Sequence, residues 1–219
     1  FEGKYKSGEA LHMELDEIEK IRGLYTPVKL GLAAAFACAA FTFLLGGGPV
    51  EMICAFIGAG LGNFLRSHLI RRHYTLYLGI VSSVALACLA YIGSLKIAEA
   101  LLPLEGGHEV GYICAMLFII PGFPFITSGI DLAKLDMRSG LERLAYAVII
   151  VVIATTTAWV LAMVLGLQPG EFINLSIPPA LLLILRLITS FVGVFGFSVM
   201  FNSPVRIAAS APATGALAN

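Results

Sequence analysis

Charged residues are scarce in this sequence. Asp, Glu, Lys and Arg together account for 13% of the 219 residues, whereas a soluble domain carries about 25%. Hydrophobic residues account for 58%. Because the chain lacks the polar surface that a soluble fold of this length needs, the composition predicts an integral membrane protein. The 14 basic residues balance the 14 acidic ones, which gives no reason to expect a nucleic-acid partner.

Residue patterns typical of metal sites and of enzymes are also missing. The histidines form no His-x-x-x-His or His-Glu pattern, and no nucleotide-binding loop or Gly-x-Ser-x-Gly elbow occurs. All cysteines lie in apolar stretches, where we expect small core residues rather than disulfides or metal ligands. They are Cys38, Cys54, Cys88 and Cys114. We therefore expect no metal, no cofactor and no enzymatic activity.

Long apolar segments, by contrast, are abundant. A membrane-spanning helix needs about 20 largely apolar residues, and six segments of the chain qualify. They run over about 28–48, 49–65, 74–95, 110–133, 143–167 and 178–200. We therefore predict an all-α fold, a polytopic transmembrane helical bundle with about six spans in the lipid bilayer.

Lys and Arg gather on one side of these six spans. If the N-terminus is cytoplasmic, twelve cations face the cytoplasm, Lys96 alone faces outside, and Arg186 lies within the sixth span. The twelve are Lys4, Lys6, Lys20, Arg22, Lys29, Arg66, Arg71, Arg72, Lys134, Arg138, Arg143 and Arg206. Since cytoplasmic loops carry an excess of Lys and Arg, this bias predicts a cytoplasmic N-terminus. The first 27 residues are polar and contain no secretory signal peptide.

Apolar residues recur at helical spacing before the first span, with acidic residues on the opposite face. The apolar positions are Leu11, Leu15, Ile18 and Ile21 or Arg22, and the acidic ones are Glu14, Glu17 and Glu19. This pattern predicts an amphipathic helix that leads to a stop at Thr26-Pro27. We interpret residues 1–27 as the end of a cytosolic N-terminal region. A helix lying on the bilayer is the alternative, which the acidic polar face disfavours.

A weak internal repeat divides the chain. "FLLGGGPVEMICAFIGAGLGN" (43–63) resembles "VMFNSPVRIAASAPATGALAN" (199–219), and in the six-span topology the two copies begin on opposite sides of the membrane. Inverted repeats of this kind are common in secondary transporters. We therefore assign 28–167 to a first five-span half, 168–177 to an extracytoplasmic loop, and 178–219 to the start of a second, inverted half. The remainder of that half is expected in a longer parent protein.

Two prolines and a glycine interrupt the fourth apolar segment at Pro121-Gly122-Phe123-Pro124. Because proline lacks an N–H and clashes with the preceding helical turn, we predict two half-helices, over about 110–120 and 125–133. Irregular backbone survives in hydrocarbon only where protein or a water-filled cavity surrounds it. The freed N–H groups of the second half-helix would form a partial positive end suited to a carboxylate. A plain proline kink without function is the alternative.

Polar side chains follow this break closely. Thr127 and Ser128 lie where they can cap the second half-helix or touch a ligand, and Asp131 follows on the same side. An ionisable group within a span costs about 2.5–3.5 kcal/mol on insertion scales, so Asp131 is a candidate to bind the ligand ammonium or a coupling proton. Solvation at the cytoplasmic interface is its alternative. The candidate substrate-binding residues are Pro121, Gly122, Pro124, Thr127, Ser128 and Asp131.

Charged residues after the break and in the last span are candidates for gating. Ser139 and Glu142 have the spacing of a capping box, while Arg143 could serve as an anion gate. Arg186 lies within the sixth span and needs a partner or a water path, because lipid supplies neither.

Two features of the second span have open interpretations. Glu51 begins this span on the outer side, and we interpret it as interfacial rather than proton-coupling. The Gly58-x-x-x-Gly62 face allows close helix packing. Its partner helix could belong to the same chain or to another copy in a homo-oligomer.

The segment "IIPGFPFITSGIDLAKLDMRSGLERLAYA" resembles the signature of the threonine/serine exporter family, with a Pro-Gly break, a polar segment, an Asp-Leu pair and a Ser-Gly-Leu-x-Arg turn. The lead-in "SGEALHMELDEIEKIRGLY" and the Gly-rich end of the first span are similar as well. The resemblance covers most of residues 7–206. Ile130 departs from it, since it stands where a basic residue is expected. The residues that carry over are Pro121, Gly122, Asp131, Ser139, Gly140 and Arg143.

This resemblance implies an inner-membrane exporter of small hydroxy amino acids, driven by the proton gradient, with ten spans in two halves and a soluble N-terminal region. The candidates for proton coupling or gating are Asp131, Ser139, Gly140, Arg143 and Arg186. The alternative function is a structural or regulatory membrane subunit, in which the break is only a packing kink. An intramembrane enzyme would need a nucleophile or a metal set at membrane depth, which the sequence lacks.

Overall fold

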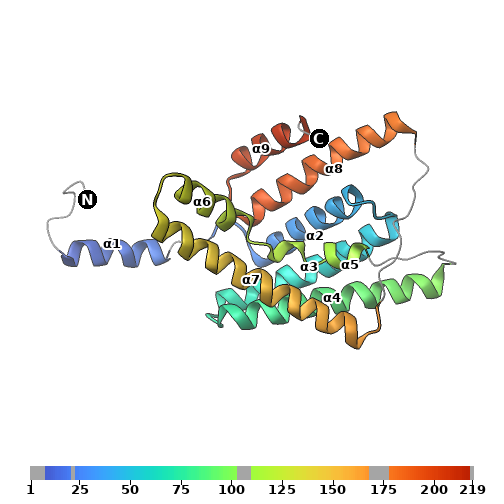
Figure 1. Cartoon of the computed structure of the whole chain (residues 1–219), viewed down its shortest axis with the longest axis horizontal. Coiled ribbons are helices and arrows are strands. Elements are labelled where there is room, and N and C mark those ends of the chain that lie inside the picture. Colours follow the sequence, from blue (N-terminus) through green and yellow to red (C-terminus); the bar gives the residue numbers. More distant parts are fainter. Residues whose placement is uncertain (1–7, 21–22, 103–109, 168–177, 218–219) are drawn as a thin grey trace.

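The computed structural model describes residues 8–20, 23–102, 110–167 and 178–217. These residues form helices and no β-strand, which confirms the all-α prediction (Figure 1). A short 3₁₀ helix, η1 (Leu117–Ile119), precedes α6. The α-helices are α1 (Gly8–Lys20), α2 (Pro27–Leu44), α3 (Pro49–Arg71), α4 (Leu76–Leu101), α5 (Val110–Cys114), α6 (Gly122–Ala133), α7 (Met137–Val164), α8 (Pro179–Met200) and α9 (Val205–Leu217).

Five of these helices, α2, α3, α4, α7 and α8, are long and apolar enough to cross a membrane. A bent pair, residues 111–119 and 122–133, makes a sixth span if it counts as one. The long helices run broadly along the long axis of the molecule in Figure 1. This arrangement matches the predicted number of spans and describes a multi-pass membrane protein.

Local signals fix both ends of α2. The Thr26 side chain accepts a hydrogen bond from the Lys29 N–H at 3.4 Å, and Pro27 occupies the first turn, where its missing N–H costs nothing. After Leu44 the chain turns through Gly46, whose φ of 90° favours glycine. The Gly47 N–H donates to the Thr42 carbonyl at 2.8 Å, which satisfies one of the last carbonyls of the helix.

The helix that contains the second predicted span extends beyond residue 65, where the apolar segment was expected to end. α3 continues to Arg71 and therefore contains Arg66 within the helix. A change in side-chain polarity marks where an apolar stretch stops, but backbone hydrogen bonds continue regardless of side-chain type. His68 and Arg71 in the last turn of α3 also suit the negative end of its dipole.

Small side chains fill the core between α2, α3 and α4. Lipid is as apolar as leucine, so helices in a membrane associate by close packing, which small residues allow. The buried small residues include Ala34, Cys38, Cys54, Ala55, Ala59, Ala87, Cys88, Cys114 and Ala115. All four cysteines are buried and free, as predicted. The Tyr112 hydroxyl donates to the Ala158 carbonyl at 2.7 Å and joins α5 to α7.

The Gly58-x-x-x-Gly62 face packs against α4 of the same chain. A Cβ at Gly58 would lie 2.7 Å from the Ala87 carbonyl oxygen, and one at Gly62 would lie 2.8 Å from the Ser83 carbonyl oxygen. These glycines therefore let the α3 and α4 backbones approach each other. The face is used within the chain, so it gives no reason to expect a homo-oligomer.

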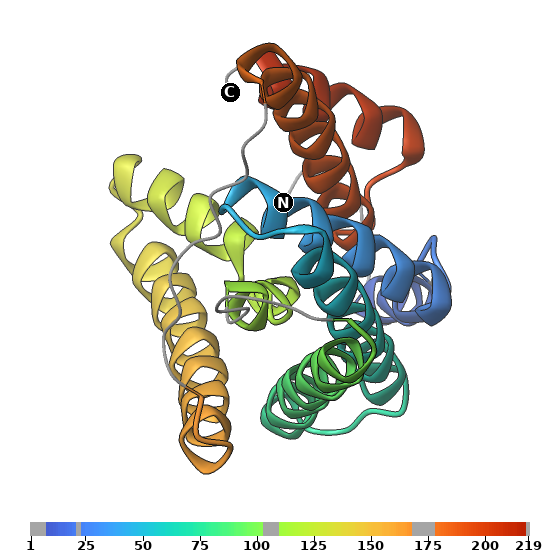
Figure 2. The ribbon, with the colours of Figure 1, turned by 90° about the vertical axis from the view of Figure 1, so that its right-hand side faces the viewer.

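α8 lies antiparallel to α2, and α9 turns back along α8 (Figure 1). Figure 2 shows α8 and α9 together on one side of the molecule. Gly193 of α8 faces Phe41, Gly196 faces Ala33 and Ala37, and the Leu24 N–H donates to the Asn202 side chain at 2.8 Å. The pair α2 and α3 thus runs opposite to the pair α8 and α9. An inverted second half remains a prediction, and residues 168–177 lie outside the described residues.

The predicted amphipathic helix before the first span is present as α1. Its apolar side chains Leu11 and Leu15 are exposed. Ile21 and Arg22, with which the predicted apolar face ended, lie outside the described residues. The assignment of residues 1–27 to a cytosolic region stays a prediction.

We expect Gly62→Ala to destabilise the protein by about 1–3 kcal/mol, because overpacking a tight contact has this cost. The new Cβ would lie 2.8 Å from Ala87 Cβ and from Phe118 Cζ. Gly93→Ala on α4 is the matched control, since no atom lies within 4 Å of its added Cβ. Thermal unfolding of the full-length protein in nanodiscs measures the effect, and equal midpoints for the two variants would contradict the assigned packing.

Candidate functional site

The break in the fourth span bends the chain by 60°. The first half is shorter and less regular than predicted, since it consists of α5, a turn and η1. The second half, α6, begins at Gly122 rather than near residue 125. Pro124 therefore lies in the first turn of α6, where a residue without an N–H is tolerated.

Few backbone N–H groups are free at the start of α6. The Gly122 N–H donates to the Ile120 carbonyl at 2.9 Å, the Phe125 N–H donates to the Pro121 carbonyl at 3.2 Å, and Pro124 has none. Of residues 122–125, only Phe123 can therefore offer a free backbone N–H to a ligand. A helix dipole alone is therefore a weak candidate for holding a carboxylate here.

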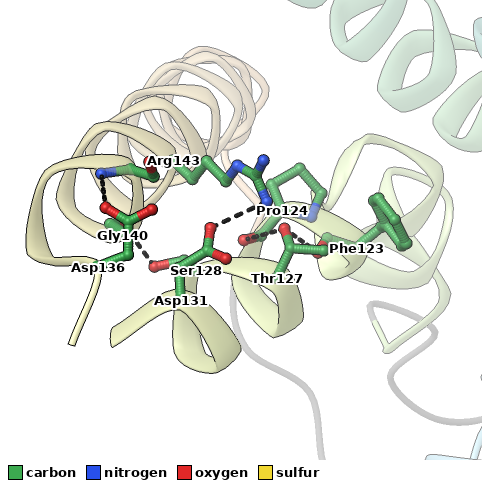
Figure 3. A network of polar contacts seen from close by, with 9 residues as sticks. Phe123, Pro124, Thr127, Ser128, Asp131, Asp136, Gly140 and Arg143 are labelled. Atoms are coloured by element: carbon green, nitrogen blue, oxygen red, sulfur yellow. Dashed lines mark hydrogen bonds and ion pairs between the residues drawn. The ribbon is translucent and has the colours of Figure 1, made fainter. Parts of the chain in front are cut away.

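Ser128 fastens α6 to α7. Its hydroxyl donates to the Gly140 carbonyl at 2.8 Å, and the serine is buried (Figure 3). A Cβ at Gly140 would lie 2.7 Å from the Leu132 side chain, so only glycine allows this approach. Thr127 instead donates to the carbonyls of its own helix, at Phe123 and Pro124. Both hydroxyls have intramolecular acceptors.

Asp131 and Arg143 form an ion pair across the same two helices. Arg143 Nη1 lies 3.0 Å from Asp131 Oδ2 (Figure 3). This oxygen is buried and receives no well-directed hydrogen bond, so the arginine charge is its partner. The Asp131 side chain is 21% exposed and that of Arg143 is 52% exposed. The pair therefore lies at the edge of the bundle, partly within reach of solvent.

A side chain in the turn between α6 and α7 caps the start of α7. Asp136, not Ser139, caps α7, because its side chain accepts from the Ser139 N–H at 3.3 Å. The hydrogen bonds from Ser139, together with the nearby charge of Arg143, lower the pKa of the Asp136 carboxyl. Glu142 pairs with Arg138 at 3.2 Å on the exposed face. These residues shape the turn.

A cavity of about 370 Å³ lies on the other side of the break. This volume falls within the range of about 300–1,000 Å³ that is typical of small-molecule sites. Its lining comes from the start of α2, from α3, the break, α7 and the end of α8. The lining residues include Tyr25, Leu30, Asn63, Arg66, Ser67, Arg71, Phe118, Ile120, Pro121, Pro124, Tyr146, Ile150, Met200 and Asn202.

Only Pro121 and Pro124 of the predicted substrate-binding residues line this cavity. Gly122 borders open space, since no atom lies within 4 Å of a Cβ placed there. The remaining candidates on α6 and α7 belong to the helix pair described above. Arg186 is exposed on α8 and has no ion-pair partner among the residues described. Glu51 is buried in the first turn of α3.

Sequence reasoning missed Asn63 and Arg66 as residues of the candidate site. Arg66 was counted only as a cytoplasmic charge because the second span was expected to end before it. The signal that could have found both is their spacing, since residues three apart share one face of a helix. Asn63 donates its side-chain N–H to the Leu30 carbonyl at 2.8 Å, which ties α3 to α2 beside the cavity.

A protein-family model described as "Putative threonine/serine exporter" matches residues 2–166, about three quarters of the chain. The matched region contains the break, the α6–α7 turn, and both Asn63 and Arg66. No curated protein and no solved structure gives a significant match.

We expect Asp131→Asn and Arg143→Gln to act non-additively on stability, with a coupling of about 0.2–1 kcal/mol, because each removes the same partly exposed ion pair. The measurement is a double-mutant cycle by thermal unfolding in nanodiscs. Arg138→Gln and Glu142→Gln form the matched control cycle, and their more exposed pair should show no measurable coupling. Strict additivity for Asp131 and Arg143 would rule out a contribution of their pair to stability.

Proposed function

Because the chain belongs to the threonine/serine exporter family, we propose that it is the transport part of a secondary exporter of threonine, serine or similarly small hydroxy amino acids, driven by the proton gradient. The family match and the set of apolar helices point to a membrane transporter rather than an enzyme. The proposed location is the inner membrane, with the N-terminus in the cytoplasm.

The observation that carries this proposal is the position of the cavity against the broken span. Irregular backbone within a bilayer is tolerated where it lines a cavity, and substrate sites of secondary transporters typically lie at discontinuous helices. Here Ile120, Pro121 and Pro124 line a cavity large enough for a small solute. We assign the substrate to this cavity.

The break also leaves α6 outside the main packed group of helices, which supports a role as a hinge. α5 packs in the core with α2 and α3, and the hydrogen bond from Tyr112 to the α7 backbone ties α7 to the same group. α6, by contrast, is fastened to the start of α7 by Ser128 and Asp131. Movement of α6 about Pro121 and Gly122 would change its packing on α7 and the access to the cavity. Gating of this kind is one way in which secondary transporters alternate access to a fixed site.

We assign proton coupling to the ion pair that holds α6 on α7. Protonation of Asp131 would remove the negative charge that faces Arg143, and the contact across α6 and α7 would weaken. A proton would thereby bias the helix pair between two arrangements. Arg143 is one of the twelve cations of the predicted cytoplasmic side, which supports a position of the pair on the side from which an exporter loads its substrate.

We expect Asp131→Asn to reduce gradient-driven threonine efflux by about 5–150-fold, the usual range for the loss of a coupling interaction. The assay loads cells with a threonine-containing dipeptide and follows threonine release by the full-length parent protein. Asp136→Asn is the matched control, because it makes the same chemical change on the exposed turn and keeps an oxygen that can cap α7; its efflux should equal that of the wild type.

Each result of this assay decides a different part of the proposal. Efflux by the wild type that Asp131→Asn leaves unchanged would reject the coupling role and leave export standing. Threonine release no faster than in cells without the protein would reject the exporter itself and favour a structural or regulatory subunit.

A further inference from the structure

We propose that Arg66 binds the carboxylate of the transported amino acid within the cavity beside the break. This inference rests on the proposed function and assigns the residue that recognises the substrate. It starts from an arginine in a helix long and apolar enough to span a membrane, at a cavity wall, with no carboxylate partner among the described residues. From the sequence, this residue was counted only as a cytoplasmic charge.

The guanidinium of Arg66 has unused hydrogen-bonding capacity. Its Nη1 donates to the Phe118 carbonyl at 3.5 Å, which is the upper limit for such a bond. Its Nε is buried and has no acceptor. An arginine carries five N–H donors in a planar fork, and a buried donor without an acceptor is destabilising. A ligand with two acceptor oxygens would satisfy the donors that the protein leaves open.

The charge of Arg66 is uncompensated as well. Within the part of the chain that the structure describes, no carboxylate forms an ion pair with it. Arg143, by contrast, has Asp131 as its partner. A cation held inside a span is costly unless an anion or water faces it, and Arg binds carboxylates through two parallel N–H···O bonds. A carboxylate ligand therefore fits both the geometry and the charge.

Other residues of the cavity give the ligand an orientation. Asn63 and Ser67 line the same cavity from the same helix, close to Arg66 along the chain. Asn63 uses its side-chain N–H on the Leu30 carbonyl, so its remaining oxygen is an acceptor suited to an ammonium group. Ser67 supplies a hydroxyl. An α-amino acid with a polar side chain matches this set better than a simple anion does.

Arg71 is a weaker candidate for the same role, although it also lines the cavity. Its Nη2 donates to the Tyr25 carbonyl at 2.7 Å, and its side chain is exposed at the end of α3. We assign to Arg71 the tether between α3 and the start of α2. The deeper arginine is left as the anion-binding group.

The test measures threonine binding to the purified full-length protein in nanodiscs by calorimetry. Arg66→Gln should weaken binding about 30-fold or more, the usual effect of removing one partner of a buried charge pair. Arg66→Lys should restore part of the affinity, because it keeps the charge but loses the fork. Arg72→Gln is the matched control, since Arg72 is exposed at the end of the same helix and does not line the cavity; its affinity should equal that of the wild type.

A second arm compares two ligands, and its first measurement uses only the wild type, so it does not depend on how the variants fold. The wild type should bind threonine more tightly than threoninamide, which lacks the carboxylate, and Arg66→Gln should lose this preference. Equal affinity of the wild type for the two ligands, or unchanged threonine binding by Arg66→Gln, would overturn the assignment of Arg66. In that case efflux by the wild type would still support the exporter. Absence of threonine binding and efflux in the wild type would overturn both proposals.

Discussion

The absence of water from the bilayer core is the constraint on which this structure depends. Each backbone polar group there must find a partner inside the protein, yet Pro121 and Pro124 remove donors from the middle of a span. The chain meets the constraint by enclosing the break. Gly62 lets α3 approach so closely that the Phe118 ring lies where a side chain would be, and the Phe118 carbonyl faces Arg66.

The charged residues near the break lie in two separate places. On one side, α6 and α7 are joined by a buried serine and by the ion pair of Asp131 and Arg143. On the other side, Arg66 lines a cavity, and it forms no ion pair with any residue that the structure describes. The two arginines near the break therefore differ in their partners, although both carry the same charge. Arg143 holds α6 and α7 together, whereas Arg66 has N–H donors that are available to a ligand.

Several parts of this arrangement could be predicted from the sequence. The apolar segments predicted the number of spans, because a bilayer has a fixed thickness. Pro121 and Pro124 predicted the position of the break, because their rings disfavour a regular helix. The partner of the Gly58-x-x-x-Gly62 face could not be predicted, since close packing by small residues is the same within a chain and between chains. The continuation of α3 beyond the apolar segment could not be predicted, because side-chain polarity does not stop a helix.

The sequence by itself therefore determined the membrane class of this protein, its helices and the place where one of them breaks, since each depends on neighbouring residues and on bilayer thickness. Only the tertiary structure decided which side chains meet. Ser128 and Gly140 are twelve residues apart and Arg66 and Phe118 are 52 apart, so their contacts follow from how the helices pack. The same packing gave Arg143 a carboxylate partner and, within the described ranges of the chain, gave none to Arg66.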